Sequence, residues 1–396
     1  MLDSLYNTWH RIKNTTAFEV IFNIYLIFSF RMIPQPNRLI SLDALRGFTI
    51  AAMLMVNFPG SEEHVFFTLR HTKWNGLSFT DLVAPIFLFV VGASISFAYQ
   101  KRKADGSPKG ELYKKIVIRS LKIFAVGMFL NLMPDFNFDE IRWTGTLHRI
   151  AFVFLGCAIL FLNTDWKQQA WICAIILVGY WLALTLIPTP GVGKVMLEPG
   201  VNIVAWVDSQ WLPGKMWQGT WDPESILSTF PSIASGITGM LAGRLLQSHF
   251  SANEKVNYLM TAGVFSAAAG YFWGLGFPVN ENLWTSSFVL VTSGFASLLL
   301  GALYFLIDIL GKTRGTQFGI IFGANAIAAY VLGDILSLLF YRLKFGTHSL
   351  NEHAVNALIN IGITPNLASL MYALFFVGIN FIPIYILYKR KIFIKL

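Results

Sequence analysis

Apolar runs of about 20 residues recur along this chain, and each is long enough to cross the hydrocarbon core of a bilayer as an α-helix. We count about ten of them. Because backbone groups in lipid must satisfy one another, such a series predicts an all-α polytopic membrane bundle. The expected spans lie near 39–58, 79–99, 116–133, 147–163, 170–188, 226–247, 257–277, 287–308, 319–341 and 366–388.

Composition agrees with a protein whose main solvent is lipid. Of 396 residues, 55% are hydrophobic and 13% are charged, against about 25% charged in soluble domains. The formal charge of +9 comes from short basic clusters between the apolar runs, as at 101–115. This distribution indicates a positive-inside signal and no nucleic-acid partner. Cys157 and Cys173 fall within apolar runs, so we expect buried thiols and no metal site.

The basic clusters also predict an orientation. When successive loops are assigned alternately to the two sides, most Lys and Arg residues fall on one side, which is then cytoplasmic. The opposite loops hold only scattered bases. With ten spans, both termini are expected in the cytoplasm.

Residues 1–37 are expected to form an extension ahead of a transmembrane domain at 38–396. The apolar stretch 17–30 is short for a span. It is interpreted as an interfacial helix, as an eleventh span, or as sequence upstream of a second plausible start at Met32.

His71 is our candidate catalytic base, since an imidazole can accept a proton near neutral pH. The sequence alone leaves rivals, namely His64, His148, His348 and His353. Asp81 could orient His71 or could simply stabilise the start of a helix. Asn57 could donate a hydrogen bond to a developing oxyanion, or could cap the first span before Pro59 and Gly60.

Two pairs of polar residues could meet the phosphates of a nucleotide-like ligand. Asp43 and Arg46 stand three residues apart at the cytoplasmic start of the first span, where they could equally form an ordinary ion pair. His148 and Arg149 open the fourth span, where the arginine could contact a phosphate or an anionic acceptor, or could be an interfacial anchor.

Two long extracytoplasmic loops, near 59–78 and 189–225, are expected to hold the substrate. The first contains Trp74 and Asn75. Glu224 follows a helix-initiating Asp-Pro pair, which favours a structural role there. The expected substrate-binding set is Trp74, Asn75, Asp81, Glu224, Asn282 and Trp284.

Several longer segments are more specific evidence of function than these single residues. The segments RLISLDALRGFTIAAMLMVNFPG, RHTKWNGLSFTDLVAPIFLFVVGASI, GTLHRIAF, DPESILST, VNENLWTSSFVL and GANAIAAYVLGD occur in that order. Together they resemble the heparan-α-glucosaminide N-acetyltransferase family, a group of transmembrane acyltransferases, over nearly all of 38–396.

The resemblance implies transfer of acetyl from cytoplasmic acetyl-CoA to the amine of an amino sugar or glycan on the far side of the membrane. It places the family's active histidine at His71 and its important asparagine at Asn57. The resemblance implies no metal, and it implies that the protein forms a homodimer. The chain looks like a bacterial relative, so the expected location is the inner (plasma) membrane.

The large luminal domain of the lysosomal enzyme has no counterpart in this sequence, so the acceptor is expected to differ from heparan sulfate. Two other interpretations remain open. A secondary transporter of a sugar or small solute would also contain spans broken by Gly and Pro. A scaffold or sensory protein would show no turnover.

Overall fold

The computed structural model describes residues 39–106 and 108–394. The expected extension 1–37, with the apolar stretch 17–30, lies outside the described residues. The described part is mostly helical, in agreement with an all-α membrane protein.

The helices follow the expected spans closely, with short elements between them. The helical elements are α2 (Ile40–Asn57), η1 (Phe67–Leu69), α3 (Phe79–Ala104), α4 (Lys109–Leu132), α5 (Thr146–Asn163), α6 (Trp166–Leu186), α7 (Ile203–Trp211), α8 (Thr229–Leu246), α9 (Ala252–Gly274), α10 (Ser286–Leu303), η2 (Tyr304–Ile309), α11 (Thr316–Ala324), α12 (Ala326–Ser337), η3 (Leu338–Arg342), α13 (Leu350–Asn360) and α14 (Pro365–Lys389). A two-stranded antiparallel pair, β1 (Lys344–Phe345) and β2 (His348–Ser349), precedes α13.

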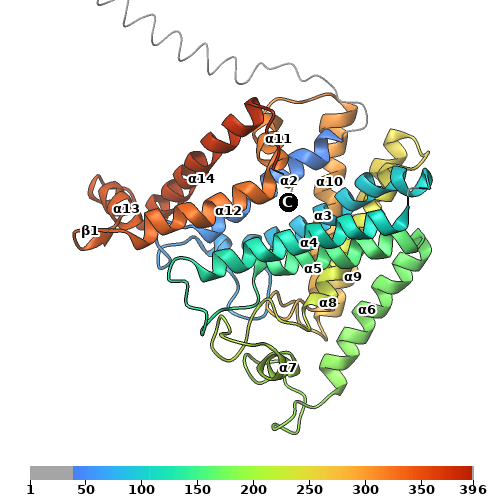
Figure 1. Cartoon of the computed structure of the whole chain (residues 1–396), viewed down its shortest axis with the longest axis horizontal. Helices are drawn as coiled ribbons and strands as arrows, with labels where there is room; N and C mark the ends of the chain where they lie inside the picture. Colours follow the sequence, from blue (N-terminus) through green and yellow to red (C-terminus); the bar gives the residue numbers. More distant parts are fainter. Residues whose placement is uncertain (1–38, 107, 395–396) are drawn as a thin grey trace, which may run out of the picture.

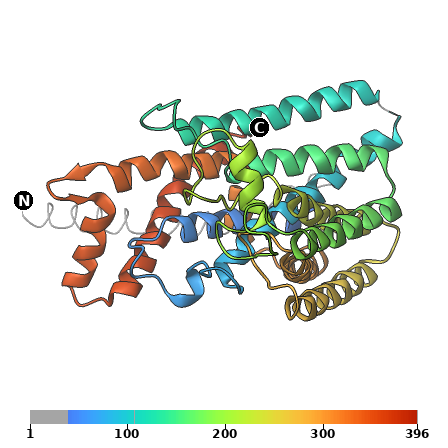
Figure 2. The same cartoon turned by 90° about the horizontal axis from the view of Figure 1, so that it is seen from below.

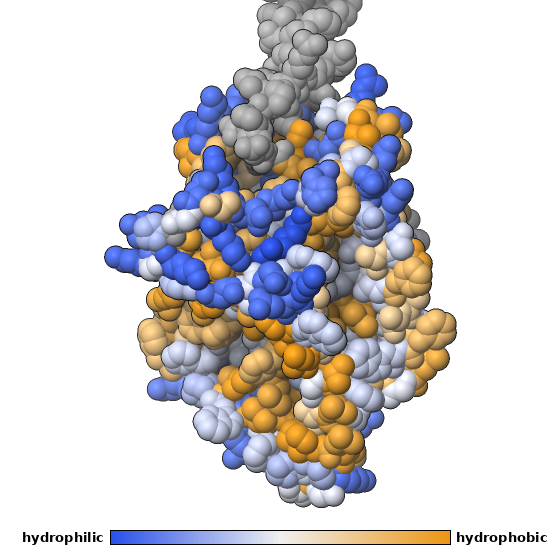
Figure 3. All heavy atoms as spheres, turned by 90° about the vertical axis from the view of Figure 1, so that its right-hand side faces the viewer, coloured by the Kyte–Doolittle hydropathy of each residue, from blue (hydrophilic) through white to orange (hydrophobic). Residues whose placement is uncertain are grey.

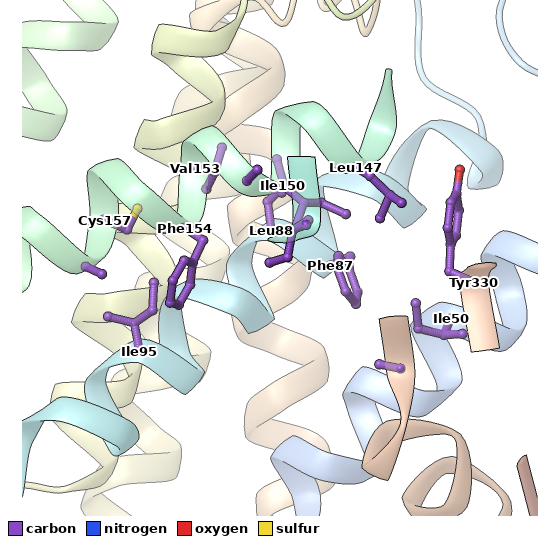
Figure 4. Close-up of a cluster of buried hydrophobic side chains, with 14 of the residues drawn as sticks. Ile50, Phe87, Leu88, Ile95, Leu147, Ile150, Val153, Phe154, Cys157 and Tyr330 are labelled. Atoms are coloured by element: carbon purple, nitrogen blue, oxygen red, sulfur yellow. The ribbon is translucent and has the colours of Figure 1, made fainter. Parts of the chain in front are cut away.

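Helix α3 lies at the centre of the bundle, in contact with α2, α5, α8 and α10. Figures 1 and 2 show α12, α13 and α14 at one end of the molecule and α6 and α9 at the other. The largest hydrophobic cluster joins these parts. In it, side chains such as Ile50, Phe87, Ile150 and Tyr330 come from α2, α3, α5 and α12 (Figure 4).

Glycine allows α2 and α11 to pack backbone against backbone. A Cβ atom at Gly47 would lie 1.6 Å from the carbonyl oxygen of Gly319, and one at Gly323 would lie 2.1 Å from that of Asp43. Small residues are the usual means of close helix approach in membranes. The N-terminal half of α2 is therefore packed closely against α11.

Among residues 39–106 and 108–394, six helices are long and apolar enough to cross a membrane: α2, α3, α5, α6, α10 with η2, and α14. The apolar stretches of α6 and α14 are only 28% and 33% buried inside the protein, as expected of helices that face lipid. Figure 3 shows the hydrophobic surface of one face next to a hydrophilic patch. The expected spans 116–133, 226–247 and 257–277 coincide with α4, α8 and α9, which are helical but less apolar.

The expected span 319–341 is broken. Helices α11 and α12 pass the same test only together and are bent by 84°. The break falls at buried Asn325, whose backbone is not helical. Its side-chain amide donates to the carbonyl oxygen of Ile392 (3.1 Å) and accepts from the backbone N–H of Ile394 (2.8 Å). These bonds replace some of those lost at the break.

Candidate functional site

The helix-start sequence Ser-x-x-Asp fixes the first carboxylate of the site. Ser78 caps α3, and Asp81 completes the capping box by accepting from the Ser78 backbone N–H at 2.8 Å. The same oxygen, Oδ2, accepts from the Thr72 hydroxyl at 3.0 Å. With Oδ2 occupied in this way, the fully buried Asp81 presents Oδ1 to His71.

His71 follows η1, and one of its ring nitrogens faces two carboxylates. Nδ1 lies 2.8 Å from Asp81 Oδ1 and 2.8 Å from Glu281 Oε2. Both contacts are satisfied when Nδ1 carries a proton and donates to the two oxygens. The other nitrogen, Nε2, forms no hydrogen bond with residues 39–106 or 108–394 in the structure. Nε2 is therefore the atom available to a substrate.

The carboxylates change the acid–base properties of His71. Burial by itself lowers the pKa of the imidazole, but the hydrogen bonds and negative charges of Asp81 and Glu281 outweigh it and raise the pKa from 6.5 to about 10. Burial raises the pKa of Glu281 to about 7, against the opposing effect of His71. At neutral pH the imidazole is therefore mainly the cation, held between two carboxyl groups.

His71 opens into a cavity of about 420 Å³, which we call the His71 cavity. Its wall combines apolar side chains of α2, α3 and α5 with polar residues from the loops. Sites for small molecules commonly measure about 300–1,000 Å³ and combine these two kinds of surface. Its polar members include His71, Arg149, Glu224, Glu281, Asn282 and Trp284.

Arg149 brings a buried positive charge to this cavity. Its Nη2 donates to the Pro223 carbonyl and the Ser228 hydroxyl, both at 2.6 Å. Its guanidinium lies 4.4 Å from the centre of the Trp284 ring. Within the described parts of the chain it forms no ion pair with a carboxylate, so its charge is balanced by dipoles and an aromatic face.

A partly buried ion pair holds the loop 217–224, which lines the cavity. Arg142 donates from Nε and Nη2 to the two oxygens of Asp222, at 2.7 and 2.6 Å, and from Nη2 to Glu224. Although burial alone would raise the pKa of Asp222, the hydrogen bonds and charge of Arg142 hold it below its usual value. Glu224 thus lines the cavity and also accepts a hydrogen bond from Arg142.

Several of the expected site residues lie together here, namely His71, Asp81, Arg149, Glu224, Asn282 and Trp284. Trp74 and Asn75 instead hold loops beside the cavity. Trp74 donates to the Leu197 carbonyl at 2.9 Å, and Asn75 accepts from Asn280 at 3.0 Å.

The remaining expected residues lie elsewhere. Asn57 lines a neighbouring hollow and not the His71 cavity. Arg46 pairs with Asp43 at 3.0 Å and donates to Ser94 at 2.7 Å, near the opposite end of α2. His148 is buried against Phe124, and its ring nitrogens have no hydrogen-bond partner among the described residues.

Glu281 is a site residue that the sequence does not single out, whereas its neighbours Asn282 and Trp284 are among the predicted substrate-binding residues. The available signal was an acid directly before an apolar run, a position where burial is costly without a partner. The sequence does not single out Arg142 either. Both residues find their partners far along the chain, at separations of 210 and 80 residues.

His71, Asp81 and Glu281 also lie close enough together to be candidate ligands of a cation. One ring nitrogen of His71 and one oxygen each of Asp81 and Glu281 lie within 4.8 Å of one another. A proton on Nδ1 already accounts for both short contacts, so we assign no metal here. The absence of a metal stays a prediction.

The fold and the site define a class, an integral membrane protein with several helical spans and a histidine-bearing cavity between the loops at one end of its bundle. A family model described as "Heparan-alpha-glucosaminide N-acetyltransferase, catalytic" matches residues 38–271. The chain belongs to this family, which confirms the resemblance drawn from its sequence.

Two relatives carry the name heparan-alpha-glucosaminide N-acetyltransferase. The protein from Homo sapiens is 28% identical over 430 residues, and that from Mus musculus is 26% identical over 426 residues. The alignments cover 93% and 91% of this chain. The chain spans 61% of the length of each relative.

Proposed function

We propose that this chain is a membrane-embedded acetyltransferase that moves acetyl from acetyl-CoA to the amine of an amino sugar or glycan. The observation that carries the proposal is the arrangement at His71, with Nδ1 held by two carboxylates while Nε2 is left to a cavity of ligand size. A histidine oriented in this way is suited to proton transfer at an attacking nucleophile.

The reaction balances without a further reagent. The amine nitrogen attacks the thioester carbonyl carbon, a carbon–nitrogen bond forms, and the carbon–sulfur bond breaks. In the neutral form of the imidazole, His71 Nε2 accepts the proton that the amine loses on attack and returns it to the departing thiolate. An ammonium acceptor sheds one further proton to solvent before it attacks. Direct transfer and an acetyl-histidine intermediate both require Nε2.

Arg149 is suited to stabilise the negative charge that develops on the thioester oxygen, because its charge already borders the cavity. Asn57 remains a predicted catalytic amide. It follows Met53, which lines the His71 cavity, by one turn on the same face of α2.

Acetyl-CoA would meet the protein through cations of α2 and α4. Arg46 and Arg119 lie close enough to interact electrostatically, and they come from α2 and α4. Two guanidinium groups within electrostatic reach of each other suit the phosphates of a nucleotide. Asp43 would orient Arg46 through their ion pair, and His148 remains a predicted contact.

For the whole domain, 38–396, we propose ten membrane crossings with both termini in the cytoplasm, in a bacterial inner membrane. The loops assigned to the far side contact one another, which supports the alternation: Tyr341 donates to the Pro59 carbonyl at 2.8 Å, and Asn280 donates to Asn75 at 3.0 Å. Residues 1–37 would precede this domain as an extension. A homodimer is proposed from the family resemblance.

A transporter is the second candidate. The broken pair α11 and α12, with buried Asn325 at its bend, resembles the discontinuous helices that bind solutes in transporters. A transporter needs no acetyl-CoA, so the two functions differ in a measurable product.

The test is release of free CoA thiol by purified protein with glucosamine and other amino sugars. We expect acceptor-dependent release from the wild type and a fall of about 10²- to 10⁴-fold in His71→Ala. His249→Ala, which removes an exposed histidine that lines none of the cavities described above, is the matched control. Equal turnover in the two variants would exclude His71, and no release with any acceptor would favour the transporter.

A further inference from the structure

A second and larger cavity adjoins the His71 cavity, and apart from Asn57 the mechanism above uses none of the residues that line it. It measures about 890 Å³ and lies where the end of α2, the loop 58–64, η3 and α13 meet. We call it the Asn57 cavity. Its polar and aromatic wall includes Asn57, Glu62, Glu63, Trp217, Tyr341 and Glu352.

The wall of this cavity is fixed by hydrogen bonds to the backbone of the loop 58–64. The Tyr341 hydroxyl donates to the Pro59 carbonyl at 2.8 Å, and the Asn351 amide donates to the Gly60 carbonyl at 3.1 Å. Gly60 N–H donates in turn to the Ser369 carbonyl at 3.3 Å. The cavity is therefore largely formed before a ligand arrives, which lowers the cost of binding.

The two cavities share one wall residue. Trp217 lines both of them. Its side chain is 65% exposed, although the Arg142 guanidinium lies 5.0 Å from its ring centre. Met53 and Asn57, one turn apart on α2, line one cavity each. A chain-like ligand that fills the His71 cavity and extends past Trp217 would therefore reach the Asn57 cavity.

The charges of the Asn57 cavity are mainly negative. Three carboxylates, Glu62, Glu63 and Glu352, line it against one guanidinium, Arg342. Arg342 pairs with Asp135 at 3.3 Å, and Glu352 already caps α13 through the backbone of Ser349.

Glu62 and Glu63 thus supply most of the unbalanced charge. Neither forms an ion pair with another described residue, and both are exposed. Such a wall attracts cations and repels sulfate groups, a form of selection by charge.

We propose that the Asn57 cavity binds the neighbouring unit of an oligomeric acceptor, and that Glu62 and Glu63 select acceptors whose neighbouring unit carries an amine in place of a sulfate. This inference rests on the proposed function, because it assumes that the reacting amine sits in the His71 cavity. It assigns the protein a cationic, amine-bearing oligosaccharide as its acceptor class.

The experiment compares three acceptors: glucosamine, its β-1,4-linked dimer, and the same dimer carrying O-sulfates. We expect kcat/KM for the unsulfated dimer to exceed that for glucosamine by at least about tenfold, and the sulfated dimer to fall below glucosamine. In the double variant Glu62→Gln with Glu63→Gln, the ratio of dimer to monomer should fall about threefold to tenfold, as expected for two exposed charge contacts. This fall should shrink in high salt.

The matched control is Asp139→Asn with Glu140→Gln, two neighbouring exposed acids that line neither cavity. An unchanged ratio in the Glu62 and Glu63 variant, or a preference of the wild type for the sulfated dimer, would overturn the inference. Affinities of the three acceptors, measured by calorimetry on the same proteins, decide it independently of turnover. If dimer affinity depends on Glu62 and Glu63 while no thiol is released, the proposed function fails and the cavity assignment stands.

Discussion

Replacing Glu281 by Gln keeps the shape of the side chain and removes one of the two charges that face His71 Nδ1. Burial lowers the pKa of His71, whereas Asp81 and Glu281 together raise it to about 10. Removing an anion makes the imidazolium easier to deprotonate. The pKa of His71 should therefore fall in Glu281→Gln.

The size of the fall follows from the geometry of the pair. Nδ1 and Oε2 are 2.8 Å apart, which places the centres of two delocalised charges at roughly 4 Å, worth about 1 kcal/mol in water and about 4 kcal/mol at an effective dielectric constant of 20. At 1.36 kcal/mol per pKa unit, the range is about 0.7 to 3 units. Because the His71 side chain is 54% exposed, screening favours the lower half, about 1 to 1.5 units.

Glu281→Gln should lower the pKa of His71 at every pH at which Glu281 is ionised in the wild type. Glu281, whose pKa burial raises to about 7, is ionised above that pH, so the attraction acts between about pH 7 and the pKa of His71. If neutral His71 is the active base, log kcat/KM for thiol release should rise with pH toward about 10 in the wild type. In Glu281→Gln this rise should lie about 1 to 1.5 pH units lower.

The assay is a series of kcat/KM values from pH 6.5 to 10.5, together with an NMR titration of ring-labelled histidine assigned with His71→Asn. Glu140→Gln, which removes a glutamate with 68% of its side chain exposed, should leave both curves in place. A rise that stays where it is in Glu281→Gln, or moves to higher pH, would refute the electrostatic argument.

Two further substitutions test the scaffold. Arg142→Gln leaves the Asp222 carboxylate buried without its cation, so we expect a loss of about 3 kcal/mol and a lower Tm in a thermal scan; an unchanged Tm would mean that the pair is not needed to hold its loop. Gly47→Ala places a Cβ 1.6 Å from the Gly319 carbonyl oxygen and should lower Tm strongly or prevent folding, whereas Gly179→Ala, with open space around it, should be neutral or slightly stabilising. Equal Tm values for these two variants would contradict the close packing of α2 on α11.

Much of the helical plan could be predicted because an apolar run of span length has few alternatives in lipid. The break at Asn325 could not, since it depends on bonds to Ile392 and Ile394, far along the chain. A hydropathy profile reports how apolar a segment is and not whether its backbone changes direction.

The candidate site was predictable to the extent that its residues stand close in sequence. Asp81 lies ten residues from His71 within one loop and helix start, so their pairing could be anticipated. Glu281 comes from another loop, and its approach to Nδ1 depends on how α3 packs against α10. The position of Asn57 outside the His71 cavity also depends on packing. The sequence indicates which face of α2 carries Asn57, but not the shape of the cavity next to that face.

The bond pattern at Asn325 ties the last described residues of the chain to the interior of the bundle. Its amide pairs with one donor and one acceptor of the 392–394 backbone, much as a neighbouring strand would. Deleting those residues would leave a buried amide without partners beside the bend of α11 and α12. Shortening the chain after Lys389 would therefore disturb a break that lies more than sixty positions upstream, so purification tags belong beyond residue 394.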